Sequence, residues 1–359
     1  MTATRTTSAE MQRRALRSLA DFARPSASRA FCGEFVPTIA LIIGTWTLSA
    51  HILYPRMAGG SLWCALLWGL GCVLLGIWLA RAFVIMHDAG HGALAPAAWL
   101  NQLIGHACGV FVLTPMTHWS KLHWHHHRTS GNLDKQDGLG NIYAMTLIRY
   151  LSLPGWQQFL YRRFRHRLQF WLVAPSVMFF FFHRLPMLYF PWAGIFRKPG
   201  VGELLNIVLL DALYVAAGWW SWTHWVFAKP WLFTYAIAIL LAVTIGVILF
   251  YTQHQFERTY YAHDEEWSFF DSGIKGSMTL RLPFWWLEWA IGYVNFHSVH
   301  HLKPAIPLYR LPAAHCAMRK LGIPITECRV SDLPEMFHCA LWDEERQCMV
   351  SFADVELSR

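Results

Sequence analysis

Histidine side chains gather at three places in this 359-residue sequence, with spacings suited to metal binding. Imidazole is the commonest transition-metal side-chain ligand, and iron, copper and zinc all accept it. On a helix, residues three and four positions apart share a face, so HxxxH and HxxHH patterns present their rings together. The chain holds one HxxxH pair and two HxxHH triplets: His87 and His91; His123, His126 and His127; His297, His300 and His301.

One further histidine, His254, also ends an apolar stretch and is a ninth candidate ligand. Nine imidazoles are too many for one metal ion and about right for two. His125 falls off the face shared by its neighbours and is expected to be a bystander. Four other histidines are expected to make interfacial hydrogen bonds: His51, His106, His183 and His224.

The composition indicates a membrane protein. Hydrophobic residues make up 55% of the chain and charged residues 14%, against about 25% charged in soluble domains. The 20 tryptophans suit the aromatic belts at membrane–water interfaces. The net charge of +8 comes from Lys and Arg that flank apolar runs, which favours contact with anionic lipids over nucleic acid. The eight cysteines form no CxxC pair, so neither a disulfide framework nor a thiolate metal site is indicated.

Four apolar segments are predicted to cross the membrane: residues 36–53, 62–80, 206–227 and 231–251. Arg81 would end the second crossing by snorkelling to the interface, which leaves His87 about 9 Å beyond it if the helix continues. Two crossings precede the first histidine pair and two more lie between His127 and His254, so all nine histidines fall on one side. Asp211, the one acid inside a predicted span, is expected to cap its helix or face a tunnel.

The remaining segments are predicted to surround this membrane stem. Residues 99–116 suit a re-entrant or interfacial segment, residues 170–192 an interfacial helix pair, and residues 283–296 a further interfacial stretch. Residues 302–359 resemble a soluble cap. Residues 11–24 suit an amphipathic helix lying on the membrane surface.

The chemistry expected of nine imidazoles is oxidative. Zinc is redox-inert and needs only three or four ligands, whereas two irons can reduce dioxygen to an oxidant that attacks an unactivated C–H bond. A ligating imidazole needs a partner for its other ring nitrogen. Candidates for that task lie near the histidines in sequence: Asp88, Asp134, Asp137, Glu257, Asp264, Asp271 and Asn295.

With these motifs the sequence resembles the integral-membrane fatty acid desaturases, a diiron family defined by HxxxH, HxxHH and HxxHH boxes. The likeness extends to the residues around the boxes and is closest to the bacterial acyl-lipid branch. It covers about residues 36–320, and the matching motifs are residues 86–92, 128–134, 253–257 and 295–307.

This resemblance implies an all-α integral membrane fold, with four transmembrane helices and interfacial helices under a cytosolic cap that holds the diiron site. It implies an N-terminal cytosolic segment (1–35), a membrane desaturase domain (36–320) and a C-terminal cytosolic tail (321–359). An apolar tunnel would take the acyl chain, O2 would be the co-substrate, and two iron ions would bind the eight box histidines and His254. Electrons would come from a separate ferredoxin or cytochrome b5, because the chain lacks a His-Pro-Gly-Gly haem motif. The third box begins with His297 where front-end desaturases have Gln, which argues against that branch.

The expected reaction is formation of a cis double bond in a long acyl chain of a membrane lipid. A diiron hydroxylase or ketolase is the alternative, because the same oxidant serves both outcomes. A metal transporter or sensor is disfavoured, because residues 62–80 and 231–251 contain no charge along an ion path. The expected location is the bacterial inner membrane, with the active site and both termini on the cytoplasmic side. The sequence leaves open the double-bond position, the chain length and whether the acyl carrier is a lipid, CoA or acyl-carrier protein.

Overall fold

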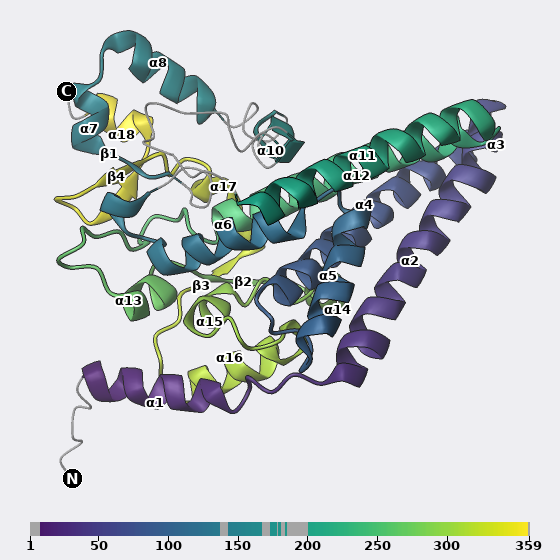
Figure 1. The fold of residues 1–359 in the computed structure, drawn as a ribbon. Coiled ribbons are helices and arrows are strands. Elements are labelled where there is room, and N and C mark those ends of the chain that lie inside the picture. The colour runs from purple at the N-terminus through teal and green to yellow at the C-terminus, as the bar shows by residue number, and fades with distance from the viewer. Residues whose placement is uncertain are drawn as a thin grey trace.

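The computed structural model describes residues 8–136, 143–166, 173–177, 179–180, 184 and 200–357. Helices form a stem at one end, and a cap of short helices and strands covers the other end (Figure 1). Within the described ranges, four helical segments are long and apolar enough to cross a membrane: Arg29–Ala58, Leu62–Gly90, Val201–His224 and Ala228–Thr252. The four predicted crossings are therefore confirmed in number, and each is longer than predicted.

The first stem segment alternates π-helical and α-helical turns. It comprises η1 (Arg29–Phe35), α2 (Val36–Thr47), η2 (Leu48–Leu53) and α3 (Tyr54–Ala58). Residues Tyr54–Ala58 continue this helix as α3 and do not break it at Pro55, the second residue of α3. The chain turns at Gly60 instead, whose φ of +95° favours glycine.

The second segment, α4 (Leu62–Gly90), runs from the stem into the cap without a break. Ser61 begins it by accepting a hydrogen bond from the Cys64 N–H. Arg81 is fully buried and pairs with the buried carboxylate of Glu34. The prediction that Arg81 snorkels to the interface is thus wrong, because α4 does not end there and packing from the first segment covers the side chain.

The stem helices α4 and α12 (Ala228–Thr252) approach closely at Gly76. A Cβ atom on Gly76 would lie 2.9 Å from the Leu241 Cβ and 3.0 Å from the Ala238 carbonyl oxygen. Only a hydrogen atom fits there without moving one helix.

We expect Gly76→Val to separate α4 from α12 and to lower the free energy of unfolding by about 1–3 kcal/mol, the usual cost of overpacking. Thermal unfolding in detergent measures the change. The control is Gly69→Val, on the same helix, where an added Cβ meets nothing within 4 Å. Equal destabilisation by the two variants would contradict the close-contact explanation.

The third segment, α11 (Val201–His224), begins earlier than predicted and contains a second acid, Glu203. This carboxylate is 1% exposed and accepts hydrogen bonds from the His118 ring and the Lys121 ammonium, at 3.0 and 2.6 Å. The prediction that Asp211 caps its helix is wrong, because Asp211 lies mid-helix, and its carboxylate forms a 3.0 Å ion pair with Arg184. Glu203 thereby fastens α11 to the helix that carries His118 and Lys121.

That helix, α6 (Met116–Thr129), follows α5 (Ala98–Phe111) after a short turn. α5 has 14 residues, so it spans about 21 Å and is too short for a bilayer core of about 30 Å. This agrees with the predicted segment that returns without crossing. It brings the second histidine triplet back beside the end of α4.

The rest of the cap consists of short elements. They are η3 (Leu133–Lys135), β1 (Met145–Thr146), α7 (Leu147–Ser152), α8 (Gly155–Phe164), α10 (Ala174–Val177), α13 (Phe269–Ile274), β2 (Thr279–Arg281), α14 (Trp285–Ala290), α15 (His297–Leu302), η6 (Leu308–Arg310), α16 (Leu311–Lys320), β3 (Glu327–Arg329), η7 (Val330–Asp332), α17 (Leu333–Met336), β4 (Leu341–Asp343), β5 (Cys348–Val350) and α18 (Phe352–Leu357). The strands, which the sequence did not predict, form a β1-β4-β5 sheet and a parallel β2-β3 pair. Most of the predicted interfacial pair at 170–192 lies outside the described residues, as do Asp137 and His183.

The predicted N-terminal amphipathic helix forms as α1 (Ser8–Ala20), but it packs on the cap. Ala15 and Leu19 are fully buried in one apolar cluster with Ala314 and Met318 of α16. Figure 1 shows α1 lying along α16. Its apolar face is therefore covered by protein and not left for a membrane surface.

Candidate metal centre

All nine predicted histidine ligands converge where the stem meets the cap. They come from the cap end of α4, from α6, from the turn after α12 and from α15. Eight of the nine are buried and His91 is partly buried. Segments more than 200 residues apart in sequence thus bring imidazoles together, as the spacing predicted.

The imidazoles form two groups, and within each group the ligand nitrogens lie within 4.8 Å of one another. The first group has five members and the second has four. Their members are His87, His91, His123, His127 and His300 in the first, and His126, His254, His297 and His301 in the second.

Each HxxHH triplet is divided between the two groups. On α6, the i, i+4 pair His123 and His127 belongs to the first group and His126 to the second. On α15, His297 and His301 belong to the second group and His300 to the first. Successive residues on a helix point about 100° apart, so each triplet can serve two sites at once. Helices α6 and α15 therefore each contribute histidines to both groups.

The distances between ring nitrogens fit metal coordination. Two nitrogens each about 2.1 Å from one ion and at right angles to each other are about 3 Å apart. In the first group, three pairs of Nε2 atoms lie close together: His87–His123 at 2.8 Å, His123–His127 at 3.0 Å and His127–His300 at 3.0 Å. In the second group, four such Nε2 pairs lie 2.9–3.2 Å apart: His254–His297, His126–His254, His126–His301 and His297–His301.

The histidines of the cap are held in the neutral form that binds metals. Burial, the main cause, lowers the pKa of the His254 imidazole to about 4. Its Nδ1–H donates to the Gly276 carbonyl at 2.9 Å, so the Nε2 lone pair faces the second group. Burial and repulsion between neighbouring rings lower the pKa of six other imidazoles well below the usual value: His91, His123, His127, His297, His300 and His301.

Of the seven residues proposed to hold a second ring nitrogen, Asp88 contacts a candidate ligand. One carboxylate oxygen lies 3.0 Å from His87 Nδ1, and the other accepts the backbone N–H of Leu308. Five of the others are engaged elsewhere or exposed, and Asp137 lies outside the described residues. Asp134 pairs with His263, Asp264 with Lys135 and Asp271 with Lys275. Asn295 donates to Glu288, and Glu257 is exposed.

We expect Asp88→Ala to weaken metal binding in the first group about 10- to 100-fold, as loss of a ligand-orienting group does. Metal retained against a graded chelator series is the measurement. Asp271→Ala, which removes a half-exposed carboxylate paired with Lys275, is the control. Equal chelator sensitivity in the two variants would show that Asp88 does not support His87.

Four histidines set aside by the sequence stay outside both groups. His125 belongs to neither group although it lies within the second triplet. The His51 ring contacts Phe227 and the His224 ring stacks on Trp220, both in the stem. His106 is half-buried on α5. The placement of His125 agrees with its predicted bystander role, and His224 forms a hydrogen bond as predicted, with 2.6 Å between its Nδ1 and the Thr223 hydroxyl oxygen.

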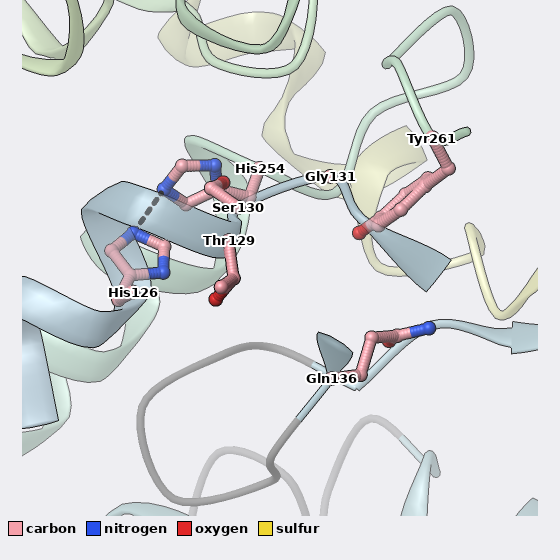
Figure 2. A pocket seen from close by; sticks show the side chains of 7 residues that line it. All are labelled: His126, Thr129, Ser130, Gly131, Gln136, His254 and Tyr261. Carbon is pink, nitrogen blue, oxygen red and sulfur yellow. Dashed lines mark hydrogen bonds between the residues drawn. The ribbon is translucent and has the colours of Figure 1, made fainter. Parts of the chain in front are cut away.

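The second group borders a small pocket in the cap. It is lined by His126, Thr129, Ser130, Gly131, Gln136, His254 and Tyr261 (Figure 2). Its empty volume is about 240 Å³ including open solvent, and the space available to the centre of a water molecule is about 10 Å³. The sequence did not indicate Tyr261, because nothing in its local pattern reveals that the chain folds back toward His126.

The fold and site define a membrane protein with two adjoining groups of histidines spaced like metal ligands, and comparison with known proteins gives its family. The sequence model for fatty acid desaturases matches residues 61–324. The chain belongs to the fatty acid desaturase family, which makes it an oxidoreductase and confirms the resemblance noted in its sequence.

Full-length relatives agree with this assignment. The chain is 30% identical to a fatty acid desaturase of Bacillus subtilis, covering 98% of this chain and 94% of the relative. It is 26% identical to an sn-1 oleoyl-lipid 12-desaturase of Picosynechococcus, covering 92% and 97% of the two chains. It is also 23% identical to an sn-1 acyl-lipid omega-3 desaturase (ferredoxin) of Synechocystis, covering 84% and 78%.

Proposed function

We propose that this desaturase binds two iron ions through its nine clustered histidines and forms a cis double bond in a long acyl chain of a membrane lipid. The observation that carries the proposal is the division of nine convergent imidazoles into groups of five and four. Two groups that share α6 and α15 are suited to two ions held side by side.

The donor set fits iron better than zinc. A group of five imidazoles exceeds the three or four ligands that zinc takes, whereas iron accepts higher coordination and cycles between oxidation states. Iron bound in both groups would supply the reduction of O2 that drives removal of two hydrogens from the acyl chain.

The protein's own residues would hold and shield this site. Asp88 orients His87 and ties the end of α4 to the loop at Leu308. Burial of the imidazoles keeps bulk water away from the reacting centre, which suppresses side reactions. The apolar stem lies directly beneath the groups and suits the approach of an acyl chain from the bilayer.

The names of relatives support the substrate and the electron donor. Acyl-lipid desaturases and ferredoxin-dependent enzymes are among them, so an acyl lipid is the proposed substrate here. A separate ferredoxin or cytochrome b5 type protein is the proposed electron donor.

The proposed location is a bacterial inner membrane, with the histidine site and both termini on the cytoplasmic side. Support comes from Arg and Lys next to the stem, which favour the cytoplasmic face. The proposed divisions are a cytosolic segment (1–35), the membrane desaturase domain (36–320) and a cytosolic tail (321–359).

The test is gas chromatography–mass spectrometry of total lipids from a desaturase-poor bacterium that expresses the chain with an electron donor. The matched control is the His300→Ala variant, and disulfide adducts locate each double bond. A new unsaturated acyl species absent from the control is the expected result. A hydroxylated or keto product would support the alternative chemistry, and an unchanged profile with an iron-loaded protein would contradict the proposed substrate class.

A further inference from the structure

The pocket beside the second histidine group places polar side chains opposite two candidate ligands. His126 and His254 form one side, and Tyr261 lies across from them (Figure 2). The Tyr261 hydroxyl points toward the interior of this space in the same view. Tyr261 is 5% exposed, so the cap holds its ring in place.

A chain of hydrogen bonds fixes the direction of the Tyr261 hydroxyl proton. The Arg165 Nη2–H donates to Gln255 Oε1 at 3.1 Å. Because a guanidinium only donates, the Gln255 oxygen must face Arg165 and its amide N–H must face Tyr261. The Gln255 Nε2–H accordingly donates to the Tyr261 hydroxyl oxygen. That oxygen is an acceptor on this side, so its own proton is left to be donated into the pocket.

The first member of this chain is a buried positive charge. Arg165 is 9% exposed, and its other Nη2 contacts are the carbonyl oxygens of Cys339 and Ala340. In the described part of the chain, no carboxylate forms an ion pair with Arg165. A charge at the end of a hydrogen-bond chain polarises the bonds that follow it, so the Tyr261 O–H becomes a stronger donor. Burial raises the pKa of the Tyr261 phenol, which keeps this hydroxyl protonated.

The pocket has room and partners for an ordered water. About 10 Å³ is open to the centre of a water molecule, which is close to the requirement for one water. The Thr129 hydroxyl, which donates to the His125 carbonyl at 2.9 Å, lines the same space. The Gln136 side-chain amide donates to the Ala144 carbonyl oxygen and accepts the Ala144 N–H, so it lines the pocket but is already hydrogen-bonded.

The reaction needs protons at this buried place. Desaturation converts a CH2–CH2 unit and O2, with two electrons and two protons, into a CH=CH unit and two water molecules. The electrons come from the donor protein, and the protons must come from solvent. The apolar stem is a poor path for protons, whereas the walls of the pocket are largely polar and include two members of the second group.

We propose that this pocket is the route by which solvent protons reach the second histidine group, and that Tyr261 is a positioning residue that orients the pocket water. The inference rests on the proposed function. A hydroxyl that donates to the water oxygen would leave the hydrogens of that water free to point away from Tyr261. No bond in Tyr261 is made or broken. The proton that moves would leave the water for O2 as it is reduced, and solvent would replace it.

The first test compares Tyr261→Phe with Tyr260→Phe. Phenylalanine keeps the ring contact that Tyr261 makes with Trp342, at 5.3 Å between centroids, and removes only the hydroxyl. Tyr260 is the neighbouring control, and its hydroxyl bonds the Glu266 carbonyl on the exposed side. For Tyr261→Phe we expect turnover to fall about tenfold or more, because a pocket water that has lost its orientation supplies protons less efficiently. The solvent deuterium isotope effect and the peroxide released per double bond should both rise, with iron content unchanged.

Identical isotope effects and peroxide ratios in the two variants would overturn the role of Tyr261. A loss of turnover without change in either ratio would also count against it, because a purely structural defect gives that pattern.

The second test concerns the route and does not use turnover. Ser130→Leu adds apolar volume at the pocket, and Ser331→Leu makes the same change at an exposed position. Uptake of Co2+ by the metal-free protein is followed by its visible absorption. We expect Ser130→Leu to slow filling of the second group about tenfold relative to Ser331→Leu, as a narrowed entry path would.

An unchanged uptake rate in Ser130→Leu would overturn the pocket as the polar route, whatever the final stoichiometry. Failure of the unaltered protein to bind Co2+ would instead contradict the metal-binding function on which the inference rests. The two failures are therefore distinguishable.

Discussion

Replacing His300 with alanine should reduce desaturation at least about a hundredfold while the protein still inserts into the membrane. His300 is the one member of the first group that comes from α15, and its Nε2 lies 3.0 Å from that of His127. Its loss detaches α15 from the site that α4 and α6 form. Because α15 lies outside the four candidate membrane spans, insertion should be unaffected. Lipid analysis, iron content and the membrane-bound fraction of the variant measure these effects.

The control for this prediction is His125→Ala, next to the candidate ligand His126 in sequence. His125 lies in neither group, so its removal should change iron content little and activity less than about threefold. Full activity with full iron content in His300→Ala would disprove the assignment of His300. Complete metal loss in His125→Ala would show that α6 presents a different face.

The second large effect should come from the buried ion pair in the stem. Arg81→Met leaves the buried Glu34 carboxylate with only the half-exposed Arg29 as an ion-pair partner, at 3.2 Å. Breaking a buried pair costs about 3–5 kcal/mol, and Arg29 places the expected loss at the lower end. The variant also loses the 2.9 Å bond from Arg81 Nε to Thr38 and the contact with the Trp289 ring, 4.2 Å away. Thermal unfolding in detergent should therefore show a strongly lowered midpoint.

A double variant separates charge from packing. Glu34→Leu combined with Arg81→Met removes both charges, and an apolar replacement of a buried pair is often neutral. We expect the double variant to recover most of the stability lost by Arg81→Met alone. If it is as unstable as the single variant, the loss comes from packing or from the Thr38 contact and not from an unpaired charge.

The sequence was sufficient to find the histidine clusters because their signal is local. Helical spacing placed His123, His126 and His127 on one side of α6, and the structure brings all nine candidates together. The stem helices were equally visible, because hydrophobic length is read directly from composition. The ends of these helices were predicted less well: the third span was predicted to begin at residue 206, whereas α11 begins at Val201 and includes Glu203.

Long-range partners could not be predicted from local pattern. Arg81 looked like the end of a membrane helix, but its partner Glu34 lies 47 residues earlier and on another segment. Division of each triplet between two groups depends on how α15 crosses α6, which no spacing within one helix determines. The chain from Arg165 through Gln255 to Tyr261 spans 90 residues at its first step. Such contacts exist only once the cap has folded.

The most direct test of the two-group centre is the iron content of the purified protein. Elemental analysis of anaerobically prepared protein should give two iron atoms per chain, and His300→Ala should lose iron while His125→Ala should not. One iron or none in an active preparation, or zinc in place of iron, would contradict the diiron centre formed by groups of five and four histidines.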